Sequence, residues 1–218
     1  MFSIKNTDAR CLFSGKHYNL DTDKLDELPA LTGISPYILG IYGNKGKIFE
    51  YPSKGSNQPT KRDFLLYANQ CNTLYFAVHG TSKPDNPLDY ALILRSSRED
   101  EGNTIKANEI EATSFSQLYL TVLGACETQT GEIDGGEGVM SLAYRFQMAG
   151  SRHVVASLNG VPPDNTAKIL KPFFENYKVK KMSIPEALYQ AKLTYLDTPN
   201  LSEGHPWFWG NLIHIGFD

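Results

Sequence analysis

The chain is poor in cysteine and lacks long apolar runs, and each shortage excludes a class of protein. Its 218 residues include only three cysteines, Cys11, Cys71 and Cys126, which form no CxxC pair and cannot all be bridged. A secreted disulfide framework is therefore not expected. No apolar stretch is long enough to span a bilayer, and the first residues lack the apolar core of a signal peptide. We expect a cytoplasmic protein with no membrane partner.

The chain also lacks a large excess of charge of either sign. The formal net charge is −3, from 21 Lys and Arg against 24 Asp and Glu. Nucleic-acid binding needs clustered Lys and Arg to neutralise phosphates. The basic run at residues 178–181 is short and typical of a helix end, where cations meet the negative dipole. No direct nucleic-acid partner is therefore expected.

Several common catalytic motifs are missing. The sequence has no Gly-x-Ser-x-Gly elbow, which disfavours a serine hydrolase. The glycine-rich segment 135–138 lacks the Lys-Ser/Thr of a phosphate-binding loop and follows no strand. The five histidines are scattered, so Cys and His do not reach the paired spacings of a zinc site. We expect neither a metal nor an organic cofactor.

Two apolar runs that are present each end in a reactive side chain. Residues 75–78 precede His79, and residues 120–125 precede Cys126. Such runs predict buried strands, and parallel strands of an open α/β sheet bring their carboxyl ends to one edge, where ligands bind. Taken singly, a strand-end cysteine or histidine is more often structural. The combination favours a Cys-His catalytic dyad.

The dyad would have a definite chemistry. A cysteine attacks as its thiolate, which a neighbouring imidazole generates or stabilises. The backbone N–H groups of Gly80 and Cys126 are candidate donors to the oxyanion. Glycine after His79 is also expected to allow a tight turn. The 47 positions between His79 and Cys126 are close to the caspase separation of about 50, although the local caspase signature is absent.

The remaining pattern alternates between strands and helices, which predicts an α/β fold with a mostly parallel central sheet flanked by helices. Glycines between residues 37–42 and 47–51 predict an N-terminal hairpin. We expect one domain over residues 1–218, with 1–35 a peripheral segment. Helices are expected at 59–70, 107–112, 137–149, 164–177 and 183–197, and further strands at 91–95 and 153–158.

Five ordered segments resemble the CHAT peptidase family, the caspase-like clan CD cysteine peptidases related to separase. They are His79-Gly80, the strand end 124–128, the acidic glycine-rich loop 131–139, the turn and strand 149–158, and the segment 205–216. The resemblance runs from about Lys61 to Gly216. It implies a caspase-like sandwich and a cysteine endopeptidase that acts on a protein or peptide. It also implies a regulatory sensor domain or activator, and that the chain is part of a larger protein.

The resemblance also bears on substrate recognition. Separase-like relatives have an aspartate that binds Arg or Lys before the scissile bond, and Asp164 matches it after a register shift. Its competing and preferred interpretation is a helix N-cap. Glu127 and Asp134 are further candidate substrate-binding residues in the acidic loop. The family's usual serine two positions before the nucleophile is Gly124 here.

The loop from Glu127 to Glu137 contains three glycines, so we expect a mobile gate that a partner orders. His205, Trp207 and Trp209 either line the cleft or belong to the core, and the core is preferred. Two other functions stay open. One is a catalytically silent CHAT-like scaffold, and the other is a cysteine hydrolase of non-peptide esters or amides.

Overall fold

The computed structural model describes the strands and helices that carry the sequence pattern. The described residues are 10–14, 18–19, 24–25, 31, 33–43, 47–50, 60–81, 90–94, 104–124, 137–158, 161–197 and 203–217. No helix among them is both long and apolar enough to cross a membrane.

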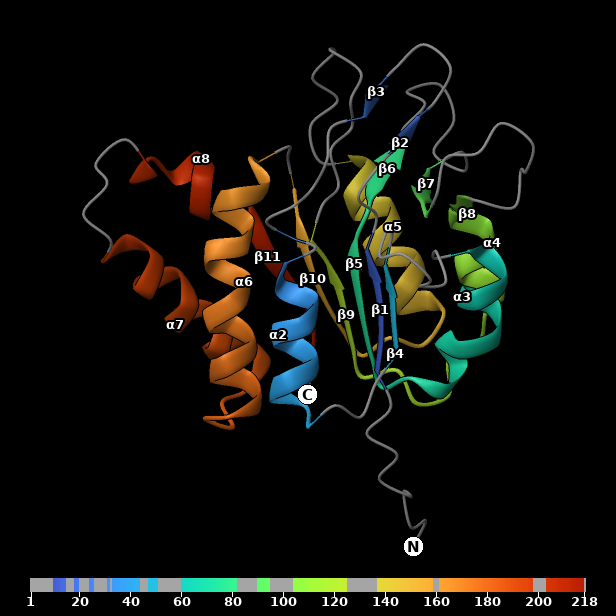
Figure 1. Cartoon of the computed structure of the whole chain (residues 1–218), viewed down its shortest axis with the longest axis horizontal. Coiled ribbons are helices and arrows are strands. Elements are labelled where there is room, and N and C mark those ends of the chain that lie inside the picture. The colour runs from blue at the N-terminus through green and yellow to red at the C-terminus, as the bar shows by residue number, and fades with distance from the viewer. Residues whose placement is uncertain are drawn as a thin grey trace, which may run out of the picture.

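A six-stranded sheet forms the centre of the molecule (Figure 1). Its order is β11 (Leu212–Gly216), β10 (His153–Ser157), β9 (Leu120–Leu123), β5 (Thr73–Ala77), β1 (Arg10–Ser14) and β4 (Lys47–Glu50). All neighbours are parallel except β11, which runs antiparallel to β10. The mixed α/β fold with a mostly parallel central sheet is therefore confirmed.

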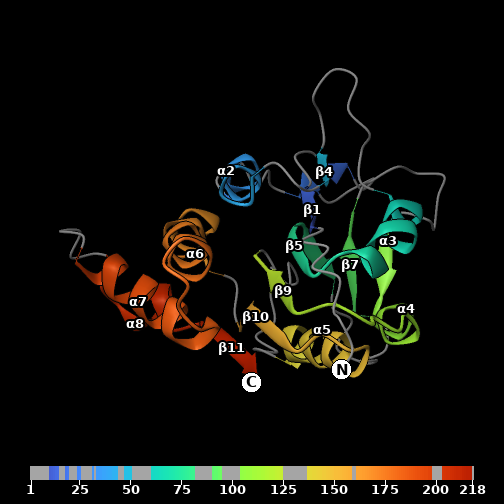
Figure 2. The ribbon, with the colours of Figure 1, turned by 90° about the horizontal axis from the view of Figure 1, so that it is seen from below.

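Helices cover both faces of this sheet (Figure 2). On one face lie α3 (Lys61–Tyr67), α4 (Ala107–Ala112) and α5 (Glu137–Met148). On the other lie α2 (Ile34–Ile41), α6 (Pro163–Lys178) and α7 (Ile184–Leu196). Successive residues of β5 alternate between the two cores, because strand side chains point to opposite faces.

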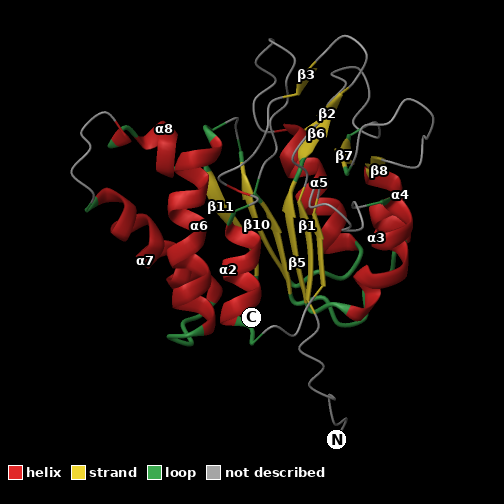
Figure 3. Ribbon diagram, in the orientation of Figure 1, coloured by secondary structure: helices red, strands yellow, loops and turns green. Residues whose placement is uncertain are grey.

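A second, three-stranded antiparallel sheet lies beyond the end of β5 (Figure 3). It consists of β6 (His79–Thr81), β7 (Ala91–Ile93) and β8 (Thr104–Lys106). Only Val78, which is fully buried, separates β5 from β6. The chain therefore passes from the central sheet into the small one at the residue before His79. A further short pair, β2 (Tyr18–Asn19) and β3 (Lys24–Leu25), is antiparallel.

Side-chain caps account for two helix starts. The Thr60 hydroxyl accepts a hydrogen bond from the Asp63 backbone N–H at 3.1 Å, and the Asp63 carboxylate accepts one from the Thr60 N–H at 3.0 Å. This reciprocal pair is a capping box that begins α3. The Ser183 hydroxyl accepts from the Glu186 N–H at 3.4 Å at the start of α7, so Ser183 is the N-cap of that helix.

The predicted N-terminal hairpin is wrong. Residues 34–41 form α2, and β4 pairs in parallel with β1 instead of folding back on residues 37–42. Ile34 and Ile38, four positions apart, are buried in the core shared with α6, so the 3.6-residue period prevails over the glycine turn signal. Residues 1–35 are not wholly peripheral either, because β1 lies between β5 and β4.

Cys71 lies in the core beside the start of β5 and is 2% exposed. It is disulfide-bonded, which the sequence did not lead us to expect. Its place before β5 is at the amino-terminal edge of the parallel strands. This disulfide therefore lies away from the carboxyl edge, where His79 follows β5.

Candidate active site

His79 lies directly beyond the carboxyl end of β5, as the sequence predicts. It opens β6, where it pairs with Ile93 of β7. The residue is completely buried, with an exposed fraction of 0%. The imidazole is therefore fixed at the edge of the sheet and covered from solvent.

The neighbouring strand β9 ends level with β5. Phe76 is in register with Leu123, and the Gly124 N–H donates to the Phe76 carbonyl oxygen at 2.8 Å. Cys126 follows two positions after Gly124 but lies outside the described residues, as do Glu127 and Asp134. The structure thus places one half of the expected dyad and the strand that leads to the other half.

Tyr75 packs beneath this edge on the face covered by α6. Its hydroxyl donates to the Leu31 carbonyl oxygen at 2.9 Å, and its ring meets that of Phe174 edge-on at a centroid distance of 5.9 Å. Complete burial raises the pKa of Tyr75 above its ordinary value, so the phenol keeps its proton. The side chain is a neutral, fixed support for the ends of β5 and β9.

Gly80 follows His79 within β6 and pairs with Leu92 of β7. Its φ angle is not positive, and a Cβ atom there would meet only the Ala91 carbonyl oxygen, at an ordinary 3.6 Å. The expectation that glycine is needed here for a tight turn is therefore wrong. The role of its N–H group toward an oxyanion stays a prediction.

Asp164 is exposed in the first turn of α6, and five residues separate the end of β10 from the start of that helix. The preferred interpretation of Asp164 as the N-cap is wrong, because Pro162 occupies that position and Pro163 is the first helical residue. A carboxylate in the first turn is still favoured by the helix dipole. Asp164 is consequently a solvent-facing anion on the helix that follows β10.

The short helix α8 (Pro206–Trp209) carries the aromatic residues near the C-terminus. His205 caps it, since its Nδ1 accepts a hydrogen bond from the Trp207 N–H at 3.2 Å. Trp207 is 46% exposed, so the preference for a core position is wrong for this side chain. Trp209 is partly buried, and its indole N–H donates to the Gly204 carbonyl oxygen at 3.1 Å.

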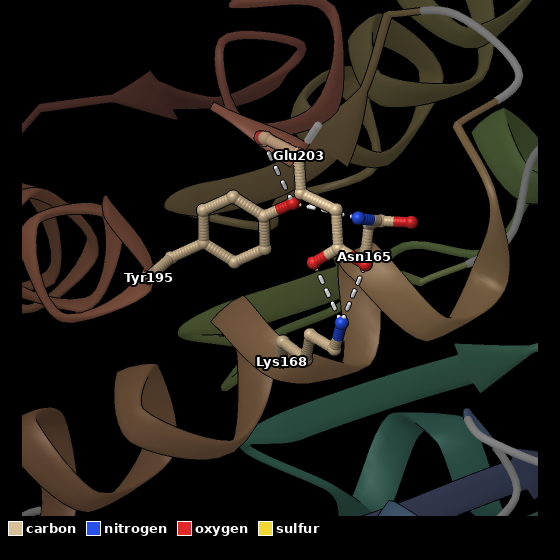
Figure 4. Close-up of polar contacts among 4 residues, drawn as sticks. All are labelled: Asn165, Lys168, Tyr195 and Glu203. Atoms are coloured by element: carbon tan, nitrogen blue, oxygen red, sulfur yellow. Dashed lines mark hydrogen bonds and ion pairs between the residues drawn. The ribbon is translucent and has the colours of Figure 1, made fainter. Parts of the chain in front are cut away.

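A polar network that the sequence did not reveal joins α6, α7 and Glu203 (Figure 4). Its residues are Asn165, Lys168, Tyr195 and Glu203. No local motif signals it, because Asn165 and Tyr195 are 30 positions apart and meet only through packing of α6 on α7. Among the residues that the structure describes, no three His, Cys, Asp or Glu gather as a metal site.

Two solved structures share the fold at low sequence identity. A crystal structure of the Arg-specific cysteine proteinase gingipain R (RgpB) has a TM-score of 0.61 and 11% identity, over 96% of this chain and 46% of that chain. A complex of the pro- and mature domains of Porphyromonas gingivalis RgpB has a TM-score of 0.58 and 10% identity, over 96% of this chain and 47% of that one. The chain spans less than half the length of either, and the likeness establishes the fold.

None of the curated proteins compared with the chain matches it. The CHAT domain family matches residues 41–217, which is most of the chain. That range contains β5, β9 and the segments that follow them, where the sequence motifs lie. The resemblance drawn from those motifs is confirmed, and the chain belongs to the CHAT domain family.

Proposed function

We propose that the chain is a cysteine endopeptidase with Cys126 as nucleophile and His79 as general base. Membership of the CHAT family and a fold shared with cysteine proteinases support a peptidase-like function. The substrate is a protein or peptide, and the reaction needs no metal or organic cofactor.

One observation carries the proposal, which is the register of β5 against β9. Phe76 pairs with Leu123, His79 lies three positions after Phe76, and Cys126 lies three positions after Leu123. Consecutive Cα atoms are about 3.8 Å apart, so Cys126 begins within about 8 Å of Gly124. His79 and Cys126 therefore follow paired residues of adjacent parallel strands by the same number of positions.

The chemistry follows from these positions. His79 accepts the thiol proton, and the Cys126 sulfur attacks the peptide carbonyl carbon to form a tetrahedral intermediate. The N–H groups of Gly80 and Cys126 donate to its oxyanion. His79 then protonates the leaving amine as the C–N bond breaks, and water hydrolyses the thioester to release the acid and the free thiol.

Three acidic residues favour a basic substrate side chain. Asp164 is exposed in the first turn of α6, and Glu127 and Asp134 follow Cys126 in the sequence. One structural neighbour is described as Arg-specific, which agrees with this preference. We assign Asp164 the main contact and the two loop carboxylates supporting contacts.

Regulation by a partner fits the burial of the base. His79 is fully covered, so a substrate reaches it only after part of its surroundings moves. The glycine-rich loop after Cys126 is the element we propose to move, under the control of a sensor domain or protein activator. The chain acts in the cytoplasm, as one domain of a longer protein.

The test is incubation of the chain with a diverse peptide library, with cleavage sites identified by mass spectrometry. We expect cleavage that is lost in Cys126→Ala and in His79→Ala but kept in His205→Ala, which removes an exposed histidine. Cleavage that survives Cys126→Ala overturns the assignment of the nucleophile. Hydrolysis of small esters without cleavage of any peptide would identify the non-peptide hydrolase instead.

No single observation favours the silent scaffold, but the same samples test for it. A scaffold leaves Cys126 unreactive toward a peptidyl acyloxymethyl ketone, whereas the proposed enzyme forms a covalent adduct on that residue. The adduct is detected by intact-protein mass, and its absence with the sensor domain present would exclude the enzyme.

A further inference from the structure

Lys168 lies one helical turn after Asp164 on α6, and the four-residue spacing places a carboxylate beside an ammonium group. The lysine nevertheless binds elsewhere. Its Nζ donates to both carboxylate oxygens of Glu203, at 2.9 and 2.7 Å (Figure 4). Glu203 therefore binds the ammonium group of Lys168, which would otherwise pair with Asp164.

Glu203 is held in place by two buried side chains. Its backbone carbonyl oxygen accepts a hydrogen bond from the Tyr195 hydroxyl at 3.3 Å, and that hydroxyl accepts one from the Asn165 side-chain amide at 2.6 Å. Asn165 and Tyr195 are each 5% exposed. Because Asn165 is the residue after Asp164, the same turn of α6 anchors Glu203 and presents the carboxylate of Asp164.

We propose that Glu203 determines the substrate charge preference of the site by keeping Lys168 away from Asp164. The proposal rests on the substrate-binding role proposed for Asp164. With Glu203 in place, the three charges sum to one net negative charge, and Asp164 binds a Lys or Arg side chain of the substrate. Without it, Lys168 pairs with Asp164 and neutralises it.

The electrostatics of Lys168 agree with this geometry. The hydrogen bond to Glu203 is the largest influence and raises the pKa of Lys168, and Asp164 adds a weaker attraction from a greater distance. The lysine side chain is 49% exposed and that of Glu203 is 25% exposed, so water screens both attractions. We therefore expect a moderate effect on preference that weakens as salt is added.

The experiment compares kcat/KM for matched peptides with Lys or Gln before the scissile bond. Glu203→Gln is expected to lower the Lys-to-Gln ratio about threefold, mainly through KM. Asp164→Asn is expected to lower it by about tenfold, since the contacting charge is lost. Glu186→Gln makes the same charge change on an exposed residue of α7 and leaves the ratio unchanged.

A rescue separates a role in specificity from a merely structural one. The double variant Glu203→Gln, Lys168→Met restores the net charge of the cluster, so the Lys-to-Gln ratio returns toward that of the parent chain. The inference is overturned if Asp164→Asn lowers the Lys-to-Gln ratio but Glu203→Gln leaves it unchanged. It is also overturned if the ratio of the double variant is as low as that of Glu203→Gln.

A second readout does not depend on activity. NMR titration measures the pKa of the Lys168 ammonium. In Glu203→Gln we expect this pKa to lie below that of the parent chain but still above its ordinary value, because Asp164 still attracts the ammonium. Adding Asp164→Asn is expected to remove this remaining rise. An identical pKa in both variants overturns the inference even if the chain cleaves peptides. Absence of all cleavage by the parent chain even with the sensor domain present, together with the expected NMR result, would refute the proposed function and leave the charge arrangement standing.

Discussion

A Cβ atom on Gly124 would lie 3.1 Å from the Cε2 atom of Tyr75 and 3.1 Å from the carbonyl oxygen of Phe76. Neither neighbour has room to retreat, because Tyr75 is fully buried and Phe76 belongs to the central sheet. The absence of a side chain at position 124 thus lets β9 end close against the ring of Tyr75. This contact supports the strand end that leads to Cys126.

Alanine at this position should destabilise the fold. We expect Gly124→Ala to lower the free energy of unfolding by about 1–3 kcal/mol, since overpacking forces the strand or the ring to shift. The measurement is urea denaturation. Gly40→Ala is the matched control, because Gly40 is exposed within α2 and a Cβ there meets nothing within 4 Å. It should raise stability by about 0.5–1 kcal/mol, and equal effects of the two changes would refute the packing argument.

The Tyr195 hydroxyl should matter more than an exposed one. Tyr195→Phe removes the acceptor of the buried Asn165 amide, so we expect a loss of about 1–3 kcal/mol in the free energy of unfolding. Tyr189→Phe removes a hydroxyl from the same helix at a residue that is 56% exposed, and should stay within about 0.5 kcal/mol. If thermal unfolding shows equal changes, Asn165 does not depend on Tyr195.

Glu109 should contribute to stability in a way that disappears in acid. Burial raises the pKa of Glu109, but hydrogen bonds from the Lys61 ammonium and the Lys106 backbone N–H outweigh this, so the pKa lies below its ordinary 4.5. The folded protein therefore binds this proton less readily than the unfolded chain. Its contribution is complete above about pH 5 and is lost as pH falls through the folded pKa.

The check is the difference in unfolding free energy between the parent chain and Glu109→Gln, measured from pH 7 down to pH 3. We expect up to about 1 kcal/mol at pH 7, because Glu109 is partly exposed, and a shrinking difference below pH 4.5. A difference that stays constant with pH would show that the lost interaction does not involve the carboxylate charge.

His79 should set the reactivity of Cys126 under the proposed mechanism. His79→Gln replaces the base with an uncharged amide side chain of similar size. Alkylation of Cys126 by iodoacetamide at neutral pH should therefore slow by about tenfold. Peptide mass spectrometry measures the rate at this residue alone. His205→Gln is the control, since His205 caps the exposed helix α8, and an equal slowing there would contradict a dyad.

The sequence predicted most of the central architecture because its strands are local apolar runs. The helix expected at 137–149 is observed as α5 over Glu137–Met148, and the strand expected at 153–158 as β10. The hairpin prediction failed because Gly43 and Gly46 resemble a turn signal, while packing of Ile34 and Ile38 against α6 decides the structure. The pairing of β1 with β5 joins residues far apart in sequence, which no local pattern reports.

The position of a candidate site residue could be predicted where a strand end fixes it. His79 lies where the apolar run implies, because a parallel strand delivers its next residues to the carboxyl edge. The position of Asp164 was misjudged by two residues, since Pro162 and Pro163 begin α6 first. The role of Glu203 was not predicted from the sequence because its partners come from α6 and α7, and only tertiary packing brings them together.

Both tryptophans of the chain, Trp207 and Trp209, lie in α8. Intrinsic fluorescence excited at the indole band therefore originates from one place, where α8 packs against α6. Trp207 is nearly half exposed, so its emission is sensitive to contact with another molecule. The unlabelled protein thus carries its own optical probe for ligands or partners that approach this end of α6.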